Sequence, residues 1–258
     1  MKLESWEFDV LGIYNPFRLG HLEVWFDFLR HKVADIPGDV VEAGVFQGKS
    51  LLTAGYVLRE VAPAKKIFGY DTFSGFPPVQ TPEDSLARFN DFAENGRIST
   101  QYEARVQKNL AHLRFLKKVE NLDFSNVSSS GSFGDTSQER IERVAEYLEL
   151  SNISLIPGPF HETMTESGKG PDKISAAILD CDLYSSYIAS LRFVWPRLSR
   201  GGIIYLDEYY SLKFPGARIA VDEFFDGSEA TLNCVTDEFN GFERWYVSKP
   251  TMGHEPTP

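Results

Sequence analysis

Four acidic residues follow two apolar segments of the sequence, and their spacing predicts a shared site. Asp180 and Asp182 come directly after the apolar run 174–179. Asp207 and Glu208 come directly after the next apolar run, at the separation of a strand–helix–strand crossover. The carboxyl ends of parallel strands line one edge of a sheet, where open α/β folds bind their ligands. The sequence therefore predicts up to four carboxylates around one point.

Carboxylates held this close repel one another unless they are protonated or share a cation. The two acidic pairs therefore favour a site for a divalent metal ion. The alternative is that these acids cap the helices that follow them, because Asp and Ser commonly start helices. Ser185 or Ser186 could take that role instead. Two acidic pairs at matching strand ends are more than capping requires, so the metal site is the favoured interpretation.

A glycine-bearing turn precedes these elements in the chain. Residues 40–60 predict a short strand, a turn and a helix, in which Gly44 permits a tight turn and Gly48 lets the backbone approach a ligand closely. The start of the helix offers free N–H groups, and Glu42 at the strand end could meet a cationic amine. The glycine spacing differs from the Gly-x-Gly-x-x-Gly dinucleotide fingerprint, and Lys49 does not complete a phosphate-binding loop.

Asp71 ends the next predicted strand, residues 66–70. It stands roughly 20 residues after the glycine-bearing turn, where dinucleotide-binding folds place an acid on the ribose hydroxyls. The alternative is an ordinary loop aspartate, but the position of Asp71 is the one that the first turn leads us to expect. The sequence thus predicts that Asp71 holds a ribose.

The alternation of strand and helix stops between residues 77 and 150. This stretch is too long for an ordinary connection and has helical character in pieces. Thr136 and Glu139 resemble a capping box, and residues 125–134 are rich in Ser and Gly, which predicts a flexible loop. We interpret residues 77–150 as an inserted lid that covers the active site and recognises the substrate.

A basic run lies inside this insertion. Six basic residues fall between Arg97 and Lys118, against the single acid Glu103. Such a run could attract an anionic substrate. A solvated helix face is the commoner cause of such a pattern, and we favour it.

Outside the insertion the chain predicts one α/β domain. Further helices are expected at residues 18–33, 184–198 and 217–225, a strand at 152–156, and a closing hairpin at 231–235 and 243–247. Residues 250–258 hold three prolines and are expected to form a disordered tail. The length of 258 residues, with 42% hydrophobic content, suits such a domain.

Charge and composition exclude several partners. The net charge of −11 argues against nucleic acid, whose phosphates call for a basic surface. No stretch approaches the ~20 apolar residues of a membrane span, and the N-terminus lacks an apolar signal core. We therefore expect a soluble, cytoplasmic protein without membrane contact. The two cysteines, Cys181 and Cys234, make neither a metal-binding spacing nor a disulfide framework.

Several separate stretches together resemble one family, the macrocin-type sugar O-methyltransferases that include the mycinamicin and novobiocin enzymes. The matching stretches occur in the right order and span most of the chain: residues 38–45, 71–77, 155–160 with Thr163, 179–186, 201–209 and 216–224. Their combination is far more specific than any one motif.

The resemblance implies a class I methyltransferase fold of the Rossmann-like type. Such a fold has a mostly parallel seven-stranded sheet with a C-terminal antiparallel hairpin, and it uses S-adenosylmethionine (SAM) and a divalent metal ion, usually Mg²⁺. Carried over by position, the cofactor-binding residues are Glu42, Gly44, Gly48, Ser50, Asp71, Thr72, Ser74 and Asp180. The metal ligands are Asp180, Asp207 and Glu208, and the general base is Asp182.

The chain departs from the family pattern at two positions. The family usually has Asp-Gly-Asp where this chain has Asp-Cys-Asp at 180–182, and Asp-Asp-Tyr where it has Asp-Glu-Tyr at 207–209. Glutamate is longer than aspartate, so whether Glu208 ligates the metal is left open. The insertion is longer than the family's and lies where substrate is recognised.

The expected reaction is metal-dependent transfer of a methyl group from SAM to a hydroxyl oxygen of a small-molecule acceptor, a sugar or sugar-like metabolite, with an anionic one as an alternative. A metal-dependent Asp-x-Asp glycosyltransferase would leave Asp71 and the second acidic pair unexplained. A dehydrogenase could use Tyr209 and Lys213, but these follow a strand and are not expected on one helix face. A non-catalytic SAM-binding protein and a homo-oligomer stay open.

Overall fold

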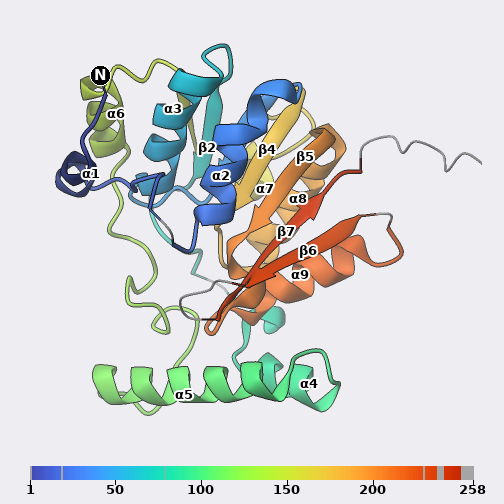
Figure 1. The fold of residues 1–258 in the computed structure, drawn as a ribbon. Helices are drawn as coiled ribbons and strands as arrows, with labels where there is room; N and C mark the ends of the chain where they lie inside the picture. The colour runs from blue at the N-terminus through green and yellow to red at the C-terminus, as the bar shows by residue number, and fades with distance from the viewer. Residues whose placement is uncertain (1, 19, 79, 229, 237–240, 251–258) are drawn as a thin grey trace, which may run out of the picture.

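The computed structural model describes residues 2–18, 20–78, 80–228, 230–236 and 241–250. In these residues the chain forms one seven-stranded sheet in the order β3-β2-β1-β4-β5-β7-β6, with helices on both faces (Figure 1). The strands are β1 Asp39–Ala43, β2 Ile67–Asp71, β3 Ile153–Pro157, β4 Ile174–Leu179, β5 Leu198–Leu206, β6 Thr231–Thr236 and β7 Glu243–Ser248. Only the pairs that include β7 are antiparallel. The predicted fold class, with its closing hairpin, is confirmed.

Strand β4 lies at the centre of the sheet, and every one of its side chains is buried because helices cover both faces there. Its residues alternate between the two faces: Ile178 packs in the cluster on one side and Leu179 in the cluster on the other. In the register with β5, Leu179 pairs with Leu206. The residues that follow these two, Asp180 and Asp207, therefore leave the sheet side by side.

Helices cover both faces of the sheet. One face is packed by α1 Ser5–Leu11, α2 Glu23–His31, α3 Lys49–Val61 and α6 Gln138–Tyr147. The other face is packed by α7 Phe160–Thr163, α8 Tyr184–Arg197 and α9 Pro215–Phe225. Helix α2 begins later than its prediction, because turns around Pro16 and Gly20 precede it, and a 3₁₀ turn, η1 Val33–Asp35, continues it.

The predicted insertion, residues 77–150, divides into two parts. Its last part is α6, which packs in the core cluster against α3. The described residues before α6 include η2 Pro82–Asp84, α4 Arg88–Glu94 and α5 Thr100–Lys117. Figure 1 shows α4 and α5 as a separate layer beyond one end of the sheet. The lid role of this layer stays a prediction, and the predicted tail lies outside the described residues except for Pro250.

A third hydrophobic cluster fixes this layer to the body of the protein. Phe89, Tyr102 and Val106 of α4 and α5 pack there with Tyr210 and Phe214, which follow β5. The layer therefore covers the carboxyl end of β5, where the acidic residues lie. None of the helices that the structure describes has the length and apolar character needed to cross a membrane.

Candidate active site

The predicted acidic residues meet at the carboxyl ends of β4 and β5. Asp180, Asp207 and Glu208 each place a carboxylate oxygen so that all three atoms lie within 4.8 Å of one another. Asp207 and Glu208 begin a single 3₁₀ turn, η3 Asp207–Tyr210, which directs both side chains to the same place. The register between β4 and β5 thus creates the cluster that the sequence predicts.

Burial and mutual repulsion govern the charges in this cluster. Burial, with the negative charge of Asp207 added to it, raises the pKa of the Asp180 carboxyl well above its usual range. The pKa of Asp182 is raised in the same way, by burial and by Glu208. Asp182 and Glu208 share a hydrogen bond that raises the pKa of Asp182 and lowers that of Glu208. Burial thus favours the protonated form of each acid, and the hydrogen bond between them adds to this effect at Asp182 and opposes it at Glu208.

The residues of the cluster fit a divalent metal ion. Asp207 Oδ1 is buried and has no hydrogen-bond partner among the described residues. Leaving a buried carboxylate oxygen unpaired is costly, and a cation beside it removes that cost. All the donors are carboxylate oxygens, which Mg²⁺ prefers. The donor set thus agrees with the metal expected from the resemblance.

Helix capping does not explain the acids at the end of β4. The N-cap of α8 is Leu183, which makes no side-chain capping bond. The N–H of Tyr184 at the start of α8 is instead bonded by Asp84 Oδ1 (2.8 Å), from the insertion. Asp182 itself has φ of 58°, a strained conformation for a residue with a side chain. The turn that carries Asp180 and Asp182 is therefore shaped for something other than capping.

Two side chains reach the cluster that sequence reasoning did not place there. Burial lowers the pKa of Lys213, but the charges of Glu208, Asp182 and the other two acids outweigh burial and raise it. Lys213 follows η3 closely, a proximity that the sequence shows. Tyr14 comes from the loop before α2, and burial with the nearby charges of Asp180 and Asp207 raises its pKa to about 12. No local pattern distinguishes Tyr14 from other loop residues.

Two acidic turns carry the cluster: the first, residues 180–182, follows β4, and the second, Asp207 and Glu208, follows β5. The glycine-bearing turn lies directly beside the first of them. Gly44 has φ of 90°, and a Cβ atom there would lie 1.9 Å from the main-chain oxygen of Asp180. Gly48 has φ of 77°, and its Cβ would meet Ile141 of α6 at 2.7 Å. Packing within the protein therefore explains both glycines, and their contact with a cofactor stays a prediction.

Glu42 is an acid with one unused oxygen. Its side chain is fully buried, and Oε1 accepts a hydrogen bond from Ser50 Oγ (2.6 Å). Oε2 is buried without a partner among the described residues. Burial raises the pKa of Glu42 to about 8. An oxygen of this kind suits the ammonium group of an amino acid, and Ser50 contributes by holding Glu42.

Asp71 holds the glycine-bearing turn by accepting hydrogen bonds from its main chain. Its Oδ2 accepts hydrogen bonds from the N–H groups of Val45 (2.8 Å) and Phe46 (2.9 Å), and its Oδ1 accepts one from Phe73 (2.8 Å). The side chain thus joins the turn after β1 to the end of β2, at the carboxyl edge of the sheet. Phe46 and Phe73 both have positive φ, as Asp182 does.

The two remaining predicted cofactor residues lie in the loop after β2. Thr72 Oγ1 donates to Gly75 O (3.0 Å) and accepts from the N–H of Ser74 (3.2 Å). The side chain of Ser74 itself is exposed. Thr72 therefore shapes the loop, while Ser74 is free to contact a ligand.

A family sequence profile identifies the family to which the chain belongs. The profile of the macrocin-O-methyltransferase (TylF) family matches residues 16–136 and 125–235 of the chain. The chain belongs to this family. The predicted resemblance to this family is confirmed.

Three curated relatives share about a quarter of their aligned residues with the chain. The mycinamicin III 3''-O-methyltransferase of Micromonospora griseorubida is 24% identical over 74% of this chain and 61% of its own length. The 8-demethyl-8-(2,3-dimethoxy-alpha-L-rhamnosyl)-tetracenomycin-C 4'-O-methyltransferase of Streptomyces olivaceus is 27% identical over 67% and 54%. The demethyldecarbamoylnovobiocin O-methyltransferase of Streptomyces niveus is 25% identical over 74% and 59%. The chain thus spans 54–61% of the length of these relatives.

Solved structures show the same fold. The O-methyltransferase NovP has a TM-score of 0.59 at 22% identity, covering 87% of this chain and 79% of its own. A calicheamicin methyltransferase has a TM-score of 0.58 at 21% identity, covering 95% and 80%. The class I methyltransferase fold is thereby shown.

The structure accounts for both departures from the family pattern. The Cys181 side chain is buried, with its Sγ 3.9 Å from Ser190 Oγ in the core, so it does not occupy the acidic cluster. The longer Glu208 side chain still brings an oxygen to Asp180 and Asp207. Neither departure removes a donor from the cluster.

Three of the six residues of the basic run bond other groups within the protein. Arg97 pairs with Asp222, Arg105 donates to Gly241 O (2.7 Å), and Lys117 donates to Ser128 O (2.9 Å). The other three basic residues are exposed. Arg97 and Arg105 thus attach the insertion to the rest of the protein, a role that neither predicted alternative covers, while Lys117 bonds within the insertion.

Proposed function

We propose that the protein transfers a methyl group from SAM to a hydroxyl oxygen of a sugar on a small-molecule natural product. The observation that carries this proposal is the contact between the glycine-bearing turn and the acidic turn, at Gly44 and Asp180. A cofactor held by the first turn would present its methyl group to an acceptor held at the second. The named activities of the curated relatives support a sugar acceptor.

The cofactor would be held at the ends of β1 and β2. The unpaired Oε2 of Glu42 would accept the SAM ammonium group, which favours the ionised form of this buried acid. Asp71 would accept the ribose hydroxyls with the lone pairs that its three main-chain bonds leave free. Thr72 and Ser74 would line the same pocket, and the main chain at Gly44 and Gly48 would border the methionine end.

Asp180, Asp207 and Glu208 would hold a divalent metal ion, for which Mg²⁺ is the best candidate. Such an ion stabilises negative charge on an acceptor oxygen and so makes its hydroxyl a stronger acid. The unpaired Oδ1 of Asp207 supports this assignment. Lys213 adds positive charge to the same place and favours ionised Asp182 and Glu208.

Asp182 would act as the general base. During transfer the acceptor oxygen loses its proton to Asp182 and forms a bond to the methyl carbon, while the carbon–sulfur bond breaks and the electron pair stays on sulfur. Burial raises the pKa of Asp182, and the positive charge of Lys213 opposes this and favours the ionised form that a base requires. We assign acceptor recognition to the part of the insertion that precedes α6, because it covers this end of the sheet.

Two alternatives are less well supported. The family match and the reversed strand β7 argue against a glycosyltransferase. The Tyr209 hydroxyl donates to Asp222 Oδ1 (2.6 Å) and so makes no dehydrogenase-type pair with Lys213. A SAM-binding protein without catalysis is the remaining competitor.

The proposal is tested by titration and by transfer. Calorimetry with SAM, a nucleotide sugar and NADH should detect binding of SAM alone. Incubation with methyl-labelled SAM, Mg²⁺ and a panel of glycosylated acceptors should then move label to a sugar hydroxyl. Binding of NADH without SAM would refute the cofactor assignment. SAM binding without transfer to any acceptor would favour the non-catalytic alternative.

A further inference from the structure

The insertion touches the first acidic turn through a buried carboxylate. Asp84 is 2% exposed and lies in η2 of the insertion. Its Oδ1 accepts from the N–H of Tyr184 (2.8 Å), and its Oδ2 accepts from Thr81 Oγ1 (2.9 Å). A Cβ atom at Gly216, near the start of α9, would lie 1.9 Å from Asp84 Oδ1. Asp84 is thus wedged between the N-terminal ends of α8 and α9, directly after the turn that carries Asp182.

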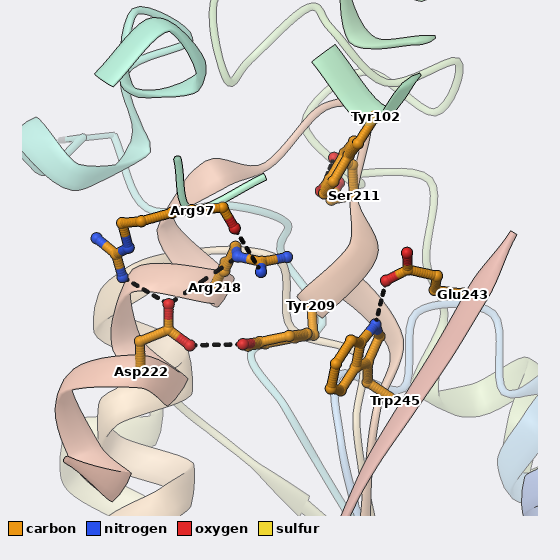
Figure 2. Close-up of polar contacts among 8 residues, drawn as sticks. All are labelled: Arg97, Tyr102, Tyr209, Ser211, Arg218, Asp222, Glu243 and Trp245. Atoms are coloured by element: carbon orange, nitrogen blue, oxygen red, sulfur yellow. Dashed lines mark hydrogen bonds and ion pairs between the residues drawn. The ribbon is translucent and has the colours of Figure 1, made fainter. Parts of the chain in front are cut away.

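The insertion reaches the second acidic turn through the network in Figure 2. Tyr209 follows Glu208, is buried, and donates its hydroxyl hydrogen bond to Asp222 Oδ1 of α9 (2.6 Å). Asp222 Oδ2 pairs with Arg97 of the insertion (2.5 Å). Arg218 lies over the Tyr209 ring, 4.5 Å from its centre, and donates to Arg97 O (3.0 Å). Asp222 therefore connects Arg97 to the residue beside a predicted metal ligand.

Helix α5 holds the main chain that continues from this turn. The Tyr102 ring stacks on Tyr210, with centroids 4.1 Å apart, and its hydroxyl donates to Ser211 O (2.7 Å). Asn109 Nδ2 donates to Leu212 O (3.1 Å). Four consecutive residues after Glu208 are therefore in contact with the insertion or with side chains that pair with it.

These contacts matter because the two acidic turns repel one another. The bases of the two turns are linked by the pairing of Leu179 with Leu206, and by the Tyr187 hydroxyl, which accepts from the N–H of Glu208 (3.1 Å) and donates to Leu179 O (2.7 Å). The residues that follow each turn are held instead by residues 81–109 and their partners, so the insertion bears on how far the acidic side chains beyond these bases are spread. Groups that orient metal ligands from outside the coordination sphere typically change metal affinity when they are altered.

We propose that the insertion is a clamp that sets the spacing of the two acidic turns, with Asp84 and Asp222 as its positioning residues. The proposal rests on the proposed function, because the spacing has a role only if these acids bind a metal ion and an acceptor. Docking of the insertion and metal binding are then coupled, and each stabilises the other by the same free energy. The competing explanation is that these contacts only attach the insertion to the core.

The experiment compares three identical changes in the full-length chain: Asp84→Asn, Asp222→Asn and the control Asp91→Asn. Asp91 also lies in the insertion and pairs with Arg88 (2.9 Å), but this pair is half-exposed and touches neither acidic turn. Mn²⁺ is titrated into each folded protein, and SAM is titrated separately by calorimetry. We expect Asp84→Asn and Asp222→Asn to weaken Mn²⁺ binding by at least ~10-fold, with SAM affinity unchanged. Asp91→Asn should change neither.

A second variant separates the loss of one hydrogen bond from a general loss of folding. Tyr209→Phe removes only the hydroxyl that bonds Asp222, and its effect on Mn²⁺ affinity should not add to that of Asp222→Asn, because both break one connection. Melting curves identify any variant that is unfolded at the assay temperature. Unchanged Mn²⁺ affinity in folded Asp222→Asn and Tyr209→Phe would overturn the clamp.

Hydrogen exchange separates failure of the clamp from failure of the metal assignment. Mn²⁺ bound to the unaltered protein should slow exchange in residues 97–110, which lie outside the acidic cluster. If the unaltered protein binds no Mn²⁺, the metal part of the proposed function is wrong. The clamp is then decided by exchange in residues 207–212 alone. Faster exchange there in Asp222→Asn than in Asp91→Asn supports it, and equal exchange overturns it.

Discussion

The carboxyl edge of the sheet has two halves that are organised in different ways: the cofactor half at the ends of β1 and β2, and the acidic half at the ends of β4 and β5. On the cofactor half, Glu42 is held by Ser50, eight positions away in the chain, and Asp71 bonds the turn directly beside its own strand. On the acidic half, the bond from Tyr184 to Asp84 joins residues 100 positions apart, and the pair of Arg97 with Asp222 spans 125. The carboxylates of the cofactor half are therefore held by residues of their own and the adjacent strand and turn, at most 26 positions away, whereas the acidic half is bonded by a segment about 100 positions away.

The difference shows where each half is vulnerable. A local turn keeps its geometry as long as its strand and helix are in place, because its own main-chain groups satisfy its carboxylates. The acidic half gathers like charges and is stable only if outside contacts or a cation oppose their repulsion. Changes on the two halves should therefore separate cofactor binding from metal binding and catalysis.

The largest expected effect comes from the acids that define the second half. Asp180→Asn and Asp207→Asn should each reduce Mg²⁺ binding and methyl transfer together, with turnover falling to background, because each removes a charged oxygen donor. Calorimetry and a transfer assay measure the two effects, and excess EDTA should abolish turnover of the unaltered protein. Full activity in EDTA would exclude the metal from the mechanism.

Asp182→Asn should have the next largest effect, on turnover alone. The amide can still donate to Glu208, so Mg²⁺ and SAM binding should persist, while kcat falls by ~10²–10⁴-fold through loss of the base. Steady-state kinetics with parallel metal and SAM titrations check this expectation. Loss of the metal in this variant would instead show that Asp182 belongs to the ligand set.

On the cofactor half, Asp71→Ala should weaken SAM binding by ~10²-fold and leave Mg²⁺ affinity unchanged. The change removes an ionised acceptor and leaves the N–H groups of Val45 and Phe46 without their partner. Asp39→Ala is the matched control: Asp39 also accepts a main-chain bond, from the N–H of Lys66 (2.8 Å), but it stands at the opposite end of β1, so its loss should leave SAM affinity unchanged. A lowered melting temperature with normal SAM affinity would make Asp71 a structural residue only.

The smallest effect is a pH dependence that belongs to Glu42. Its raised pKa, about 8, keeps the ligand-free side chain protonated at neutral pH. If ionised Glu42 pairs with the SAM ammonium group, SAM affinity should rise with pH by up to ~10-fold per pH unit and level off above pH 8. Calorimetry in buffers of different ionisation enthalpy should detect one released proton below pH 8. Glu42→Gln should abolish both effects, and a flat profile in the unaltered protein would contradict the assignment.

The raised pKa of Glu42 also makes the free energy of unfolding depend on pH. The pKa of Glu42 rises from 4.5 to about 8 on folding, so the folded state binds the proton more tightly than the unfolded state. The stabilisation that protonated Glu42 gives the folded state is fully present below pH 4.5 and is lost as the pH rises through 8. The loss is about 1.4 kcal/mol for each pH unit between the two pKa values, which amounts to a few kcal/mol. Denaturant titrations of the ligand-free protein and of Glu42→Gln across this range measure the difference.

Much of the cofactor half could be predicted from the sequence alone. Buried apolar runs identified the strands, and the residue that follows each run had to lie at the carboxyl edge. Gly44 and Asp71 were found in this way because turn chemistry depends on near neighbours. The same rule located both acidic pairs, since strand ends are visible in the sequence even when the contacts around them are not.

The tertiary structure decided which distant segments hold each half of this edge. Thr136 was expected to cap α6, but Ser137 is the cap, and Thr136 donates instead to Phe46 O in the cofactor turn. Likewise, Asp84 is one acid among several in an irregular segment, and its place at the start of α8 depends on the packing of the whole insertion. Hydrophobic periodicity records which face of an element is buried, but not which distant element covers it. The sequence alone therefore determined which residues stand at the edge of the sheet. Long-range packing determined which of them are brought together and what keeps them apart.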